Sequence, residues 1–544
     1  MSTSRRRFLI GATAGTGLAV AGTALPAIAE PIAGPAAQPV TESAAGLAPA
    51  LRVGPGAGQY PDLVRGVNLR WVGNPDEVWV ARTADDVVAA VGSALRTGRR
   101  VAVRSGGHCF EDFATGDVRV LIDVSGLDTV DYDPGRRAFA VGAGATLGEV
   151  YTKLFKGWGV TIPGGSCPTV GVGGHIAGGG YGPLNRLHGL VVDHLYAVEV
   201  VVAGRDGRAR KVVATREADD PNRDLWWAHT GGGGGNFGVV TRYWFRSKNA
   251  GGSDPTALLP KPPRELLVST VIWPWARLDQ AAFVRLVRNF TGWFAANNAP
   301  GSPLASVYAH LATFHSSGGA VALNVQIDAG LPNADRQLDA FLAAVDNGVG
   351  VAHQTVERSR LPWLLGTRWS GFADRPTGKR IKGKSAMHRG ALSERAATAL
   401  YANLTRADYT HPGSGVLIAP YGGEVTAAAP GATASVHRDS AITLLYVSEW
   451  TDPAQDGLHI DFQRRLYRDV YATTGGVPVP GAETSGAYVN YADADLLDPA
   501  WNTSGVPWST LYYRDAYPRL LETKARWDPN NVFHHRMSIG GGRR

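Results

Sequence analysis

The sequence predicts an α+β fold built from two domains. A chain of 544 residues is too long for one ordinary hydrophobic core. Up to about residue 248, short apolar strands alternate with amphipathic helices. Beyond residue 263, widely spaced strands are separated by long helices, which predicts an antiparallel sheet covered by helices on one side.

Local signals indicate each element of the first region, residues 58–250. Thr83 begins a helix, because Asp86 three residues later completes a capping box, and Thr146 and Glu149 repeat that pattern. Strands are expected at residues 77–81, 101–104, 118–124, 195–202 and 209–215. A turn at residues 204–207 joins the last two strands.

A stretch rich in Gly, Ser and Pro at residues 250–263 interrupts this pattern. The following region, residues 251–480, is predicted to be a separate domain. Its strands are expected at 266–272, 306–314, 320–327, 416–420 and 441–447. Its helices are expected at about 278–297, 333–346, 392–405 and 455–473.

Residues 1–29 have the pattern of a twin-arginine signal peptide. Arg5, Arg6 and Arg7 precede a mild apolar run, and Ala27 and Ala29 supply the small residues of a cleavage site. The alternative is a membrane anchor, for which the run is short and weakly hydrophobic. The pattern predicts a secreted protein exported already folded. Residues 30–57, rich in Ala, Pro and Gly, are expected to be a flexible linker.

Composition restricts the possible partners. The chain is 44% hydrophobic and 19% charged, which is typical of a soluble globular protein. The formal net charge of +7 is mild for this length, and no basic block carries interleaved aromatic residues. No nucleic-acid partner and no stable membrane anchor are therefore expected. His534 and His535 have no further ligands at a fixed spacing, so no metal site is predicted.

Three glycine-rich blocks indicate backbone held close to a ligand. The first follows a strand and reads Arg104-Ser105-Gly106-Gly107-His108, and the second covers residues 163–182. Exposed N–H groups on such loops bind phosphate oxygens, so a long ligand with a diphosphate is expected. The third block, 230–238, contains G-x-G-x-x-G. It precedes a strand rather than opening a helix, so it does not predict a nicotinamide site.

The motifs in these blocks resemble those of the berberine-bridge-enzyme-like FAD-linked oxidases, a group within the vanillyl-alcohol-oxidase family. The resemblance runs from about residue 60 to the C-terminus. Within this group, the chain is most similar in its motifs to actinomycete oxidases of sugars and natural products, such as glycopeptide hexose oxidases. The motifs that carry it are Arg-Ser-Gly-Gly-His108, Gly-Gly-Ser-Cys167-Pro-Thr-Val-Gly-Val-Gly-Gly-His175, Gly-Gly-Gly-Tyr181-Gly, Gly-Asn236-Phe-Gly238, Tyr488-Val-Asn490-Tyr491 and Trp527-Asp-Pro-Asn-Asn-Val-Phe533.

The resemblance implies a two-subdomain FAD-binding domain of the PCMH type. Residues 481–544 would return to complete this domain, and the sheet of residues 251–480 would cover the flavin. His108 matches the histidine bonded to the flavin 8α-methyl, and Cys167 matches the cysteine bonded to flavin C6. The residues implied to bind FAD are Arg104, Ser105, Gly106, Gly107, His108, Cys167, Val170, Gly171, Gly174, His175, Gly179, Gly180, Asn236, Gly238, Val240 and Asn490.

The two cysteines, Cys109 and Cys167, leave an alternative open. In an oxidising compartment a pair of cysteines suggests one disulfide. The resemblance instead assigns Cys167 to FAD and leaves Cys109 as a packed thiol. His175 is implied to donate to the pyrimidine edge of the flavin, where negative charge gathers on reduction, and its alternative is a buried structural histidine.

The resemblance also implies the reaction. A CH–OH group of a sugar or another metabolite gives hydride to flavin N5, a base takes the hydroxyl proton, and O2 is reduced to H2O2. Tyr488 matches the tyrosine beside the flavin and is the candidate base. Tyr181 and Tyr421 are candidate partners of Tyr488 or candidate substrate contacts. No counterpart of the glutamate base of some relatives is identified. The small residue Val170 favours an oxidase. A dehydrogenase with another acceptor, or a non-catalytic flavin- or glycan-binding protein, are the alternatives. A monomer or homodimer is expected.

Overall fold

Three β-sheets organise the part of the chain that the computed structural model describes, residues 50–373 and 378–540. The predicted signal peptide and residues 30–49 of the predicted linker lie outside these residues. The described residues belong to one unit by their internal contacts. Two sheets are antiparallel and one is mixed, with helices packed on them, so the predicted α+β class is confirmed.

The four-stranded sheet has the order β1-β2-β4-β3, in which the last three strands are parallel and β1 is antiparallel to β2. Its strands are β1 (Leu51–Val53), β2 (Glu77–Val80), β3 (Val101–Arg104) and β4 (Val120–Asp123). β1 lies in the range predicted to be flexible linker. Backbone pairing with β2 and burial of Val53 order this segment, and three residues are too few to show a periodic pattern.

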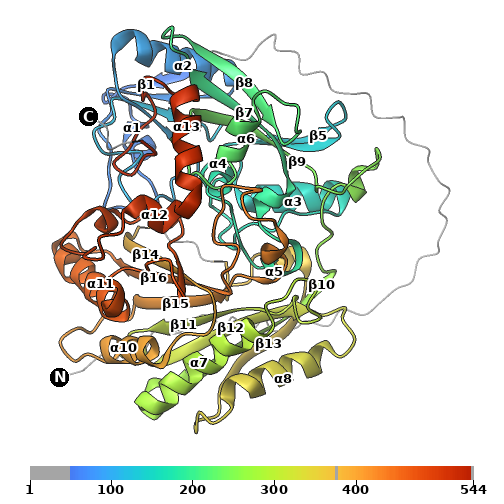
Figure 1. Cartoon of the computed structure of the whole chain (residues 1–544), viewed down its shortest axis with the longest axis vertical. Helices are drawn as coiled ribbons and strands as arrows, with labels where there is room; N and C mark the ends of the chain where they lie inside the picture. The colour runs from blue at the N-terminus through green and yellow to red at the C-terminus, as the bar shows by residue number, and fades with distance from the viewer. Residues whose placement is uncertain (1–49, 374–377, 541–544) are drawn as a thin grey trace, which may run out of the picture. The chain divides into compact units, whose positions relative to one another are not determined.

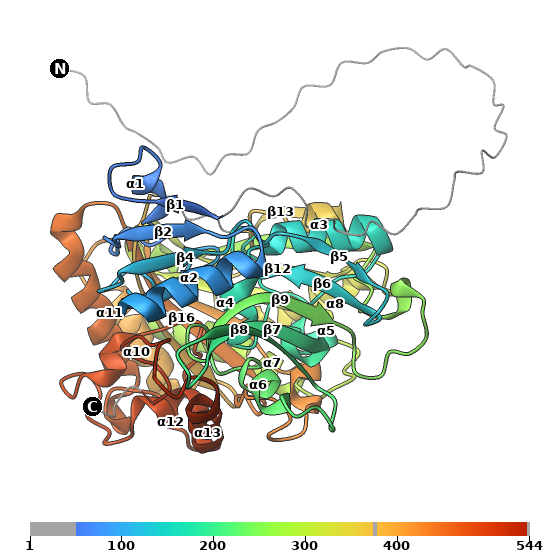
Figure 2. The same ribbon diagram turned by 90° about the horizontal axis from the view of Figure 1, so that it is seen from above.

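The five-stranded sheet is antiparallel throughout, in the order β5-β6-β9-β7-β8. Its strands are β5 (Val130–Asp133), β6 (Ala138–Gly142), β7 (Leu195–Ala203), β8 (Ala209–Thr215) and β9 (Val239–Phe245). Helix α2 (Ala84–Thr97) contacts this sheet and β4, so it lies between the two smaller sheets (Figure 2). The capping boxes predicted for α2 and for α3 (Leu147–Trp158) are both confirmed.

The eight-stranded sheet is also antiparallel, in the order β13-β10-β12-β11-β15-β16-β14-β17. Its strands are β10 (Glu265–Pro274), β11 (Tyr308–Phe314), β12 (Ala320–Asp328), β13 (Gln354–Pro362), β14 (Arg380–His388), β15 (Ser414–Pro420), β16 (Ile442–Trp450) and β17 (Thr484–Gly486). Helices on one face were predicted, and they are α7 (Gln280–Ala296), α8 (Ala334–Asp346), α10 (Glu394–Leu404) and α11 (Asp456–Val470) (Figure 1).

Three strands of this sheet, β13, β14 and β17, were not predicted. β14 carries Lys382, Lys384 and Ser385, which are buried although they are polar, so its sequence shows no apolar alternation. β13 is an edge strand with many exposed and charged residues. β17 belongs to the C-terminal segment that was expected to complete the other domain, so that segment also contributes to this sheet.

Short helices connect these layers: α1 (Tyr60–Leu63), α4 (Val172–Ala177), α5 (Asn185–His188), α6 (Arg223–Ala228), α9 (Trp363–Gly366), α12 (Trp508–Tyr513) and α13 (Tyr517–Trp527). Within the described ranges, no helix has the length and apolar character needed to cross a membrane. One large hydrophobic core joins side chains from all three sheets, and a smaller one lies beneath β1.

Several buried histidines make the fold sensitive to acid. Burial lowers the pKa of His229, His388 and His437 to about 4. The same side chains in the unfolded chain titrate near about 6.5, so between these values the unfolded state binds more protons. We therefore expect the free energy of unfolding to fall as the pH drops from 6.5 toward 4. Urea unfolding at pH 7.5 and pH 5 checks this prediction, and an equal or higher midpoint at pH 5 would contradict it.

Candidate active site

A cavity of ≈ 840 Å³ lies between the helix-free face of the eight-stranded sheet and the glycine-rich loops. This volume is in the upper part of the range of about 300–1,000 Å³ for ligand sites. Of the residues predicted for the site, Gly179, Gly180 and Tyr421 do not line this cavity, and all the others do. The segments that form its wall are residues 104–110, 165–175, 233–238 and 488–492, together with β11, β12, β15 and β16.

The loop that carries His108 begins where β3 ends. The guanidinium of Arg104 donates to Asp123 and to the carbonyl of Arg65, and Ser105 Oγ donates to the carbonyl of Ala143 at 2.7 Å. Both side chains are thus engaged by the protein. Gly107 has φ +70°, a conformation that strongly favours glycine.

The first two glycine-rich loops touch each other through their backbones. A Cβ on Gly106 would lie 2.3 Å from the backbone nitrogen of Gly171. A Cβ on Gly171 would lie 2.2 Å from the nitrogen of Gly106. These two glycines therefore allow the backbones of the two loops to touch, whereas the sequence had predicted that they bind phosphate. The contact brings His108 and Cys167 to the same wall of the cavity.

His108 and Cys167 share a neighbour. Nε2 of His108 lies 3.0 Å from the hydroxyl of Thr169, and Sγ of Cys167 lies 3.4 Å from the same hydroxyl. Burial lowers the pKa of His108 to about 4, so its imidazole is neutral at pH 7. Both cysteines are free thiols, as the assignment of Cys167 to FAD requires. Burial raises the pKa of Cys109 to about 12, which leaves it an unreactive packed thiol.

His175 lies on α4 and faces the cavity with one ring nitrogen already in use. Its Nε2 accepts a hydrogen bond from the N–H of Gly165 at 3.2 Å. Burial lowers its pKa to about 4, so the ring is neutral and carries its proton on Nδ1. A Cβ on the neighbouring Gly174 would meet no described atom within 4 Å outside its own helix backbone and chain neighbours, so this glycine opens space on the cavity wall.

Tyr488 accepts two hydrogen bonds at its hydroxyl oxygen. The donors are the N–H of Gly180 at 3.1 Å and Nδ2 of Asn490 at 2.8 Å. Burial raises the pKa of Tyr488 well above its ordinary value, with added repulsion from neighbouring tyrosines, while these two donors act to lower it. Gly179 and Gly180 both have positive φ, which lets the chain present the N–H of Gly180 to the phenol.

The structure clusters four tyrosines around this point. The ring centroid of Tyr181 lies 5.3 Å from that of Tyr488 and 5.5 Å from that of Tyr421. The hydroxyl groups of Tyr181 and Tyr491 are 2.7 Å apart. Tyr421 is buried behind Tyr181, outside the cavity lining, so the structure does not place it where a substrate contact was expected.

The third glycine-rich block is fastened to the C-terminal segment. The side chain of Asn236 donates to the carbonyl of Gly232 at 3.0 Å and accepts from the N–H of Ile539 at 3.0 Å. Lys524 Nζ donates to the carbonyl of Asn236 at 2.6 Å. A Cβ on Gly238 would lie 2.6 Å from the carbonyl oxygen of Val201, so this glycine allows close packing on β7.

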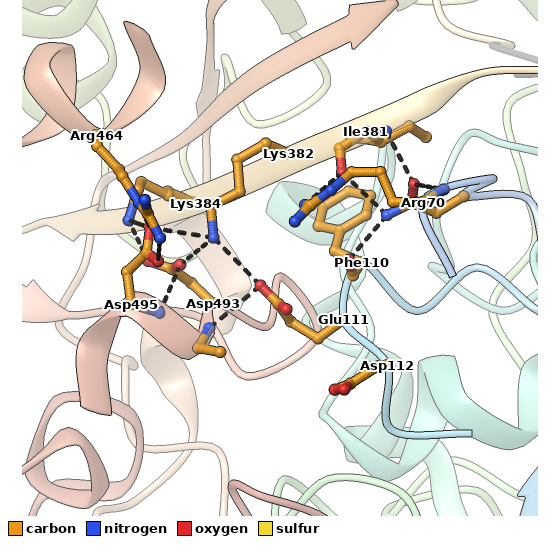
Figure 3. Close-up of polar contacts among 12 residues, drawn as sticks. Arg70, Phe110, Glu111, Asp112, Ile381, Lys382, Lys384, Arg464, Asp493 and Asp495 are labelled. Atoms are coloured by element: carbon orange, nitrogen blue, oxygen red, sulfur yellow. Dashed lines mark hydrogen bonds and ion pairs between the residues drawn. The ribbon is translucent and has the colours of Figure 1, made fainter. Parts of the chain in front are cut away.

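A buried charge network, defined by Glu111, Lys382, Lys384, Arg464, Asp493 and Asp495, lies behind the cavity wall (Figure 3). Lys382 Nζ lies 2.7 Å from Asp493 and 3.2 Å from Glu111. Burial alone lowers the pKa of Lys382, but these carboxylates and that of Asp495 outweigh it and raise the pKa overall. Burial likewise acts to raise the pKa of Asp495, and the two lysines lower it overall.

The network joins four segments that are distant in sequence, and one of them is α11, which carries Arg464. Glu111 follows the His108 loop, the lysines lie on β14, and Asp493 and Asp495 follow the tyrosine cluster. On the cavity side, the rings of Phe110 and Tyr491 stack with centroids 5.8 Å apart. The charges thus hold the His108 loop against the segment that carries Tyr488.

Several lining residues were missed by the sequence analysis. Tyr308, His310, Ala312 and Phe314 alternate along β11 and all face the cavity. The sequence shows this alternation, but it does not show the strand register, which decides which of the two faces lines the cavity. Tyr491 stood in a quoted motif without a role. Glu449 on β16 also lines the cavity, although no glutamate had been identified for this site. Among the described residues, no group of three or more His, Cys, Asp or Glu side chains could hold a metal ion.

Comparisons with known proteins agree with this geometry. Residues 75–212 match the family described as FAD binding domain, and residues 487–540 match the family described as berberine and berberine like. The chain is 52% identical to the aclacinomycin-N/aclacinomycin-A oxidase of Streptomyces galilaeus over 483 residues, 88% of each chain.

Two solved structures are similar along almost their whole length. CrmK, a flavoenzyme involved in shunt product recycling in caerulomycin biosynthesis, has a TM-score of 0.89 and 49% identity, covering 91% of this chain and 99% of its own. A glycopeptide hexose oxidase complexed with teicoplanin has a TM-score of 0.85 and 48% identity, covering 90% of this chain and 99% of its own. The similarity therefore includes the glycine-rich loops and the sheet that together enclose the cavity.

Proposed function

Since this chain belongs to the berberine-bridge-enzyme-like family of FAD-linked oxidases, we propose that it oxidises a CH–OH group with FAD attached through both His108 and Cys167. One observation carries the proposal. A neutral imidazole and a free thiol, from loops far apart in sequence, line the same cavity as Tyr488, and both contact one hydroxyl, that of Thr169. Both are nucleophiles that bond to electron-poor carbon.

The lining fits the isoalloxazine and its diphosphate chain. Glycines from three loops leave space for a long ligand, and Gly174 faces open space. FAD, when bound, accepts hydride from the substrate carbon and returns the electrons to O2 as H2O2. His175 would offer its Nδ1–H as a hydrogen-bond donor, which stabilises negative charge near it without carrying a charge of its own.

Tyr488 is the base in this proposal. A tyrosine with an ordinary pKa of about 10 needs stabilisation of its phenolate to take a proton near neutral pH. The N–H of Gly180 and the amide of Asn490 both donate to its oxygen and stabilise the phenolate, which opposes the burial that raises the pKa of Tyr488. Tyr181 lies beside it and is bonded to Tyr491, so these two hydroxyls are candidates for orienting the substrate.

The substrate class follows from the walls and the relatives together. The sheet side of the cavity is mostly aromatic and aliphatic, with Tyr308, His310 and Phe372 packed edge to face. Apolar walls suit the planar or apolar part of a natural product. The similar proteins are named for oxidation of aclacinomycins and of a glycopeptide hexose. We therefore propose a sugar hydroxyl of a glycosylated metabolite as the substrate.

Two further proposals come from the sequence. The resemblance at Val170, which lines the cavity, favours O2 as the electron acceptor over a dehydrogenase acceptor. Arg5, Arg6 and Arg7 support export by the twin-arginine route, in which the folded protein would carry FAD with it.

One experiment tests the function. The purified protein is acid-precipitated and digested. Mass spectrometry then shows whether the peptides that contain His108 and Cys167 carry flavin. The native protein is then mixed anaerobically with glycosylated aromatic metabolites and simple hexoses, and the flavin absorption is followed before O2 is admitted and H2O2 is measured. We expect flavin on both peptides, bleaching by a glycosylated metabolite, and peroxide. A colourless pellet contradicts covalent attachment, and reoxidation only by a quinone indicates a dehydrogenase.

A further inference from the structure

One hydroxyl contacts both side chains that are proposed to attach to FAD. Thr169 Oγ1 lies 3.0 Å from Nε2 of His108 and 3.4 Å from Sγ of Cys167. The backbone contact of Gly106 with Gly171 holds the two loops together, so this meeting is built into their packing. Thr169 is therefore placed to act on both nucleophiles at once.

The contact with His108 selects a ring nitrogen. A neutral imidazole has one N–H group and one lone pair, on different nitrogens. When Nε2–H donates to the hydroxyl of Thr169, the lone pair lies on Nδ1, which becomes the nitrogen that can form a new bond. The hydrogen bond also restricts rotation of the ring. With its hydroxyl as the acceptor, Thr169 thus favours the tautomer whose lone pair lies on Nδ1, and it restricts the orientation of the imidazole.

The contact with Cys167 works in the opposite direction. A hydroxyl that accepts from Nε2–H still has its own proton to donate. Donation to Sγ stabilises the thiolate, which is the nucleophilic form of cysteine. A single hydroxyl, acting as acceptor toward His108 and as donor toward Cys167, therefore prepares both groups for attack.

The loop itself does not need this hydroxyl. The side chain of Thr169 is exposed, so it buries little apolar surface. The neighbouring backbone is held by the carbonyls of Pro168 and Val170, which accept from Gly148 and Leu147 at 3.0 Å each. Removal of the hydroxyl should leave the fold in place.

We propose that Thr169 is a positioning residue for the attachment of FAD at both His108 and Cys167. This inference rests on the proposed bicovalent attachment. In each attachment, a C–H bond of the flavin, at the 8α-methyl or at C6, and the N–H or S–H bond of the side chain are replaced by one C–N or C–S bond. The two electrons and two protons released reduce one O2 to one H2O2.

Two substitutions separate the hydroxyl from the shape of the side chain. Thr169→Val removes the hydroxyl and keeps the branched outline, whereas Thr169→Ser keeps the hydroxyl. The wild type and both variants are produced side by side and sampled at successive times after induction. Peptide mass spectrometry measures the fraction of His108 peptides and of Cys167 peptides that carry flavin. Thermal unfolding midpoints of all three proteins report whether each variant folds.

We expect Thr169→Ser to match the wild type. In Thr169→Val we expect attachment at both residues to be roughly tenfold slower, the scale of a lost hydrogen bond in the step that forms each bond. Attachment in Thr169→Val at the wild-type rate would overturn the inference. So would a loss confined to one of the two residues, or an equal loss in Thr169→Ser. Absence of flavin from both peptides of the wild type would instead contradict the proposed bicovalent attachment itself.

Discussion

The Tyr488→Phe protein is expected to reduce its flavin about 10²–10⁴-fold more slowly than the wild type at saturating substrate, the usual contribution of a positioned base. The substitution removes one oxygen and leaves the ring in place between Tyr181 and Tyr491. The donors on Gly180 and Asn490 then have no phenolate to stabilise. The amount of attached flavin should not change, since Tyr488 does not contact His108 or Cys167.

Anaerobic stopped-flow absorbance measures this rate across a range of pH. Tyr446→Phe is the matched control, because it removes a buried tyrosine hydroxyl that does not line the cavity and that, within residues 50–373 and 378–540, hydrogen-bonds to Tyr471 alone, at 3.0 Å. We expect that control to reduce at the wild-type rate. A Tyr488→Phe protein that reduces as fast as Tyr446→Phe would assign the proton transfer to another group.

The second large effect is on stability. Lys382→Met is expected to lower the free energy of unfolding by ~3–5 kcal/mol, because it leaves buried carboxylates without one of their cations. The side chains of Lys382, Glu111 and Asp493 are each at most 3% exposed. In the wild type, three cations face three carboxylates in the buried charge network. The variant has two cations for the same three, and water cannot solvate the excess charge.

Denaturant unfolding followed by tryptophan fluorescence measures the loss. The double variant Lys382→Met/Glu111→Gln should recover part of it, because it restores the charge balance. Arg288→Met, which breaks the exposed pair of Arg288 with Glu394, should cost only about 0–1 kcal/mol. If Lys382→Met costs no more than Arg288→Met, the buried charge network does not hold the His108 loop against the segment that carries Tyr488.

The contribution of this network to stability is expected to fall both at low pH and at high pH. The pKa of Asp495 is lowered in the folded protein, so its contribution is present above its unfolded pKa of about 3.9 and is lost as the pH falls. The pKa of Lys382 is raised, so its contribution is full below the unfolded pKa of about 10.4 and is lost above it. Between these limits Asp495 and Lys382 both contribute fully to the stability of the fold.

The elements that were predicted well are those with strong local signals. The capping boxes at Thr83 and Thr146 appear in the structure as expected, since a cap needs only residues three positions apart. The antiparallel sheet and the helices on one of its faces followed from apolar periodicity. β14 escaped prediction because its lysines are neutralised by carboxylates more than a hundred residues away along the chain.

In the site, too, the residues with local motifs were predicted and those placed by strand register were not. Motifs pointed to His108, Cys167, His175 and Tyr488, and the structure brings all four to one cavity. It places Tyr421 behind Tyr181 instead of on the cavity wall, and it adds Tyr308 and His310, whose strand register no local pattern reveals.

By itself the sequence determined the fold class, the family and the residues available for flavin chemistry, because these depend on composition, short-range periodicity and motifs contiguous in the chain. Only the tertiary structure decided that the hydroxyl of Thr169 contacts both His108 and Cys167. It also decided that the backbone N–H of Gly180 and the side-chain amide of Asn490 both donate to Tyr488, and that Lys382 holds Glu111. Each of these arrangements needs a contact between distant segments: Thr169 with His108, Gly180 with Tyr488, and Lys382 with Glu111. Its distance and geometry are set by packing, which no stretch of sequence contains alone.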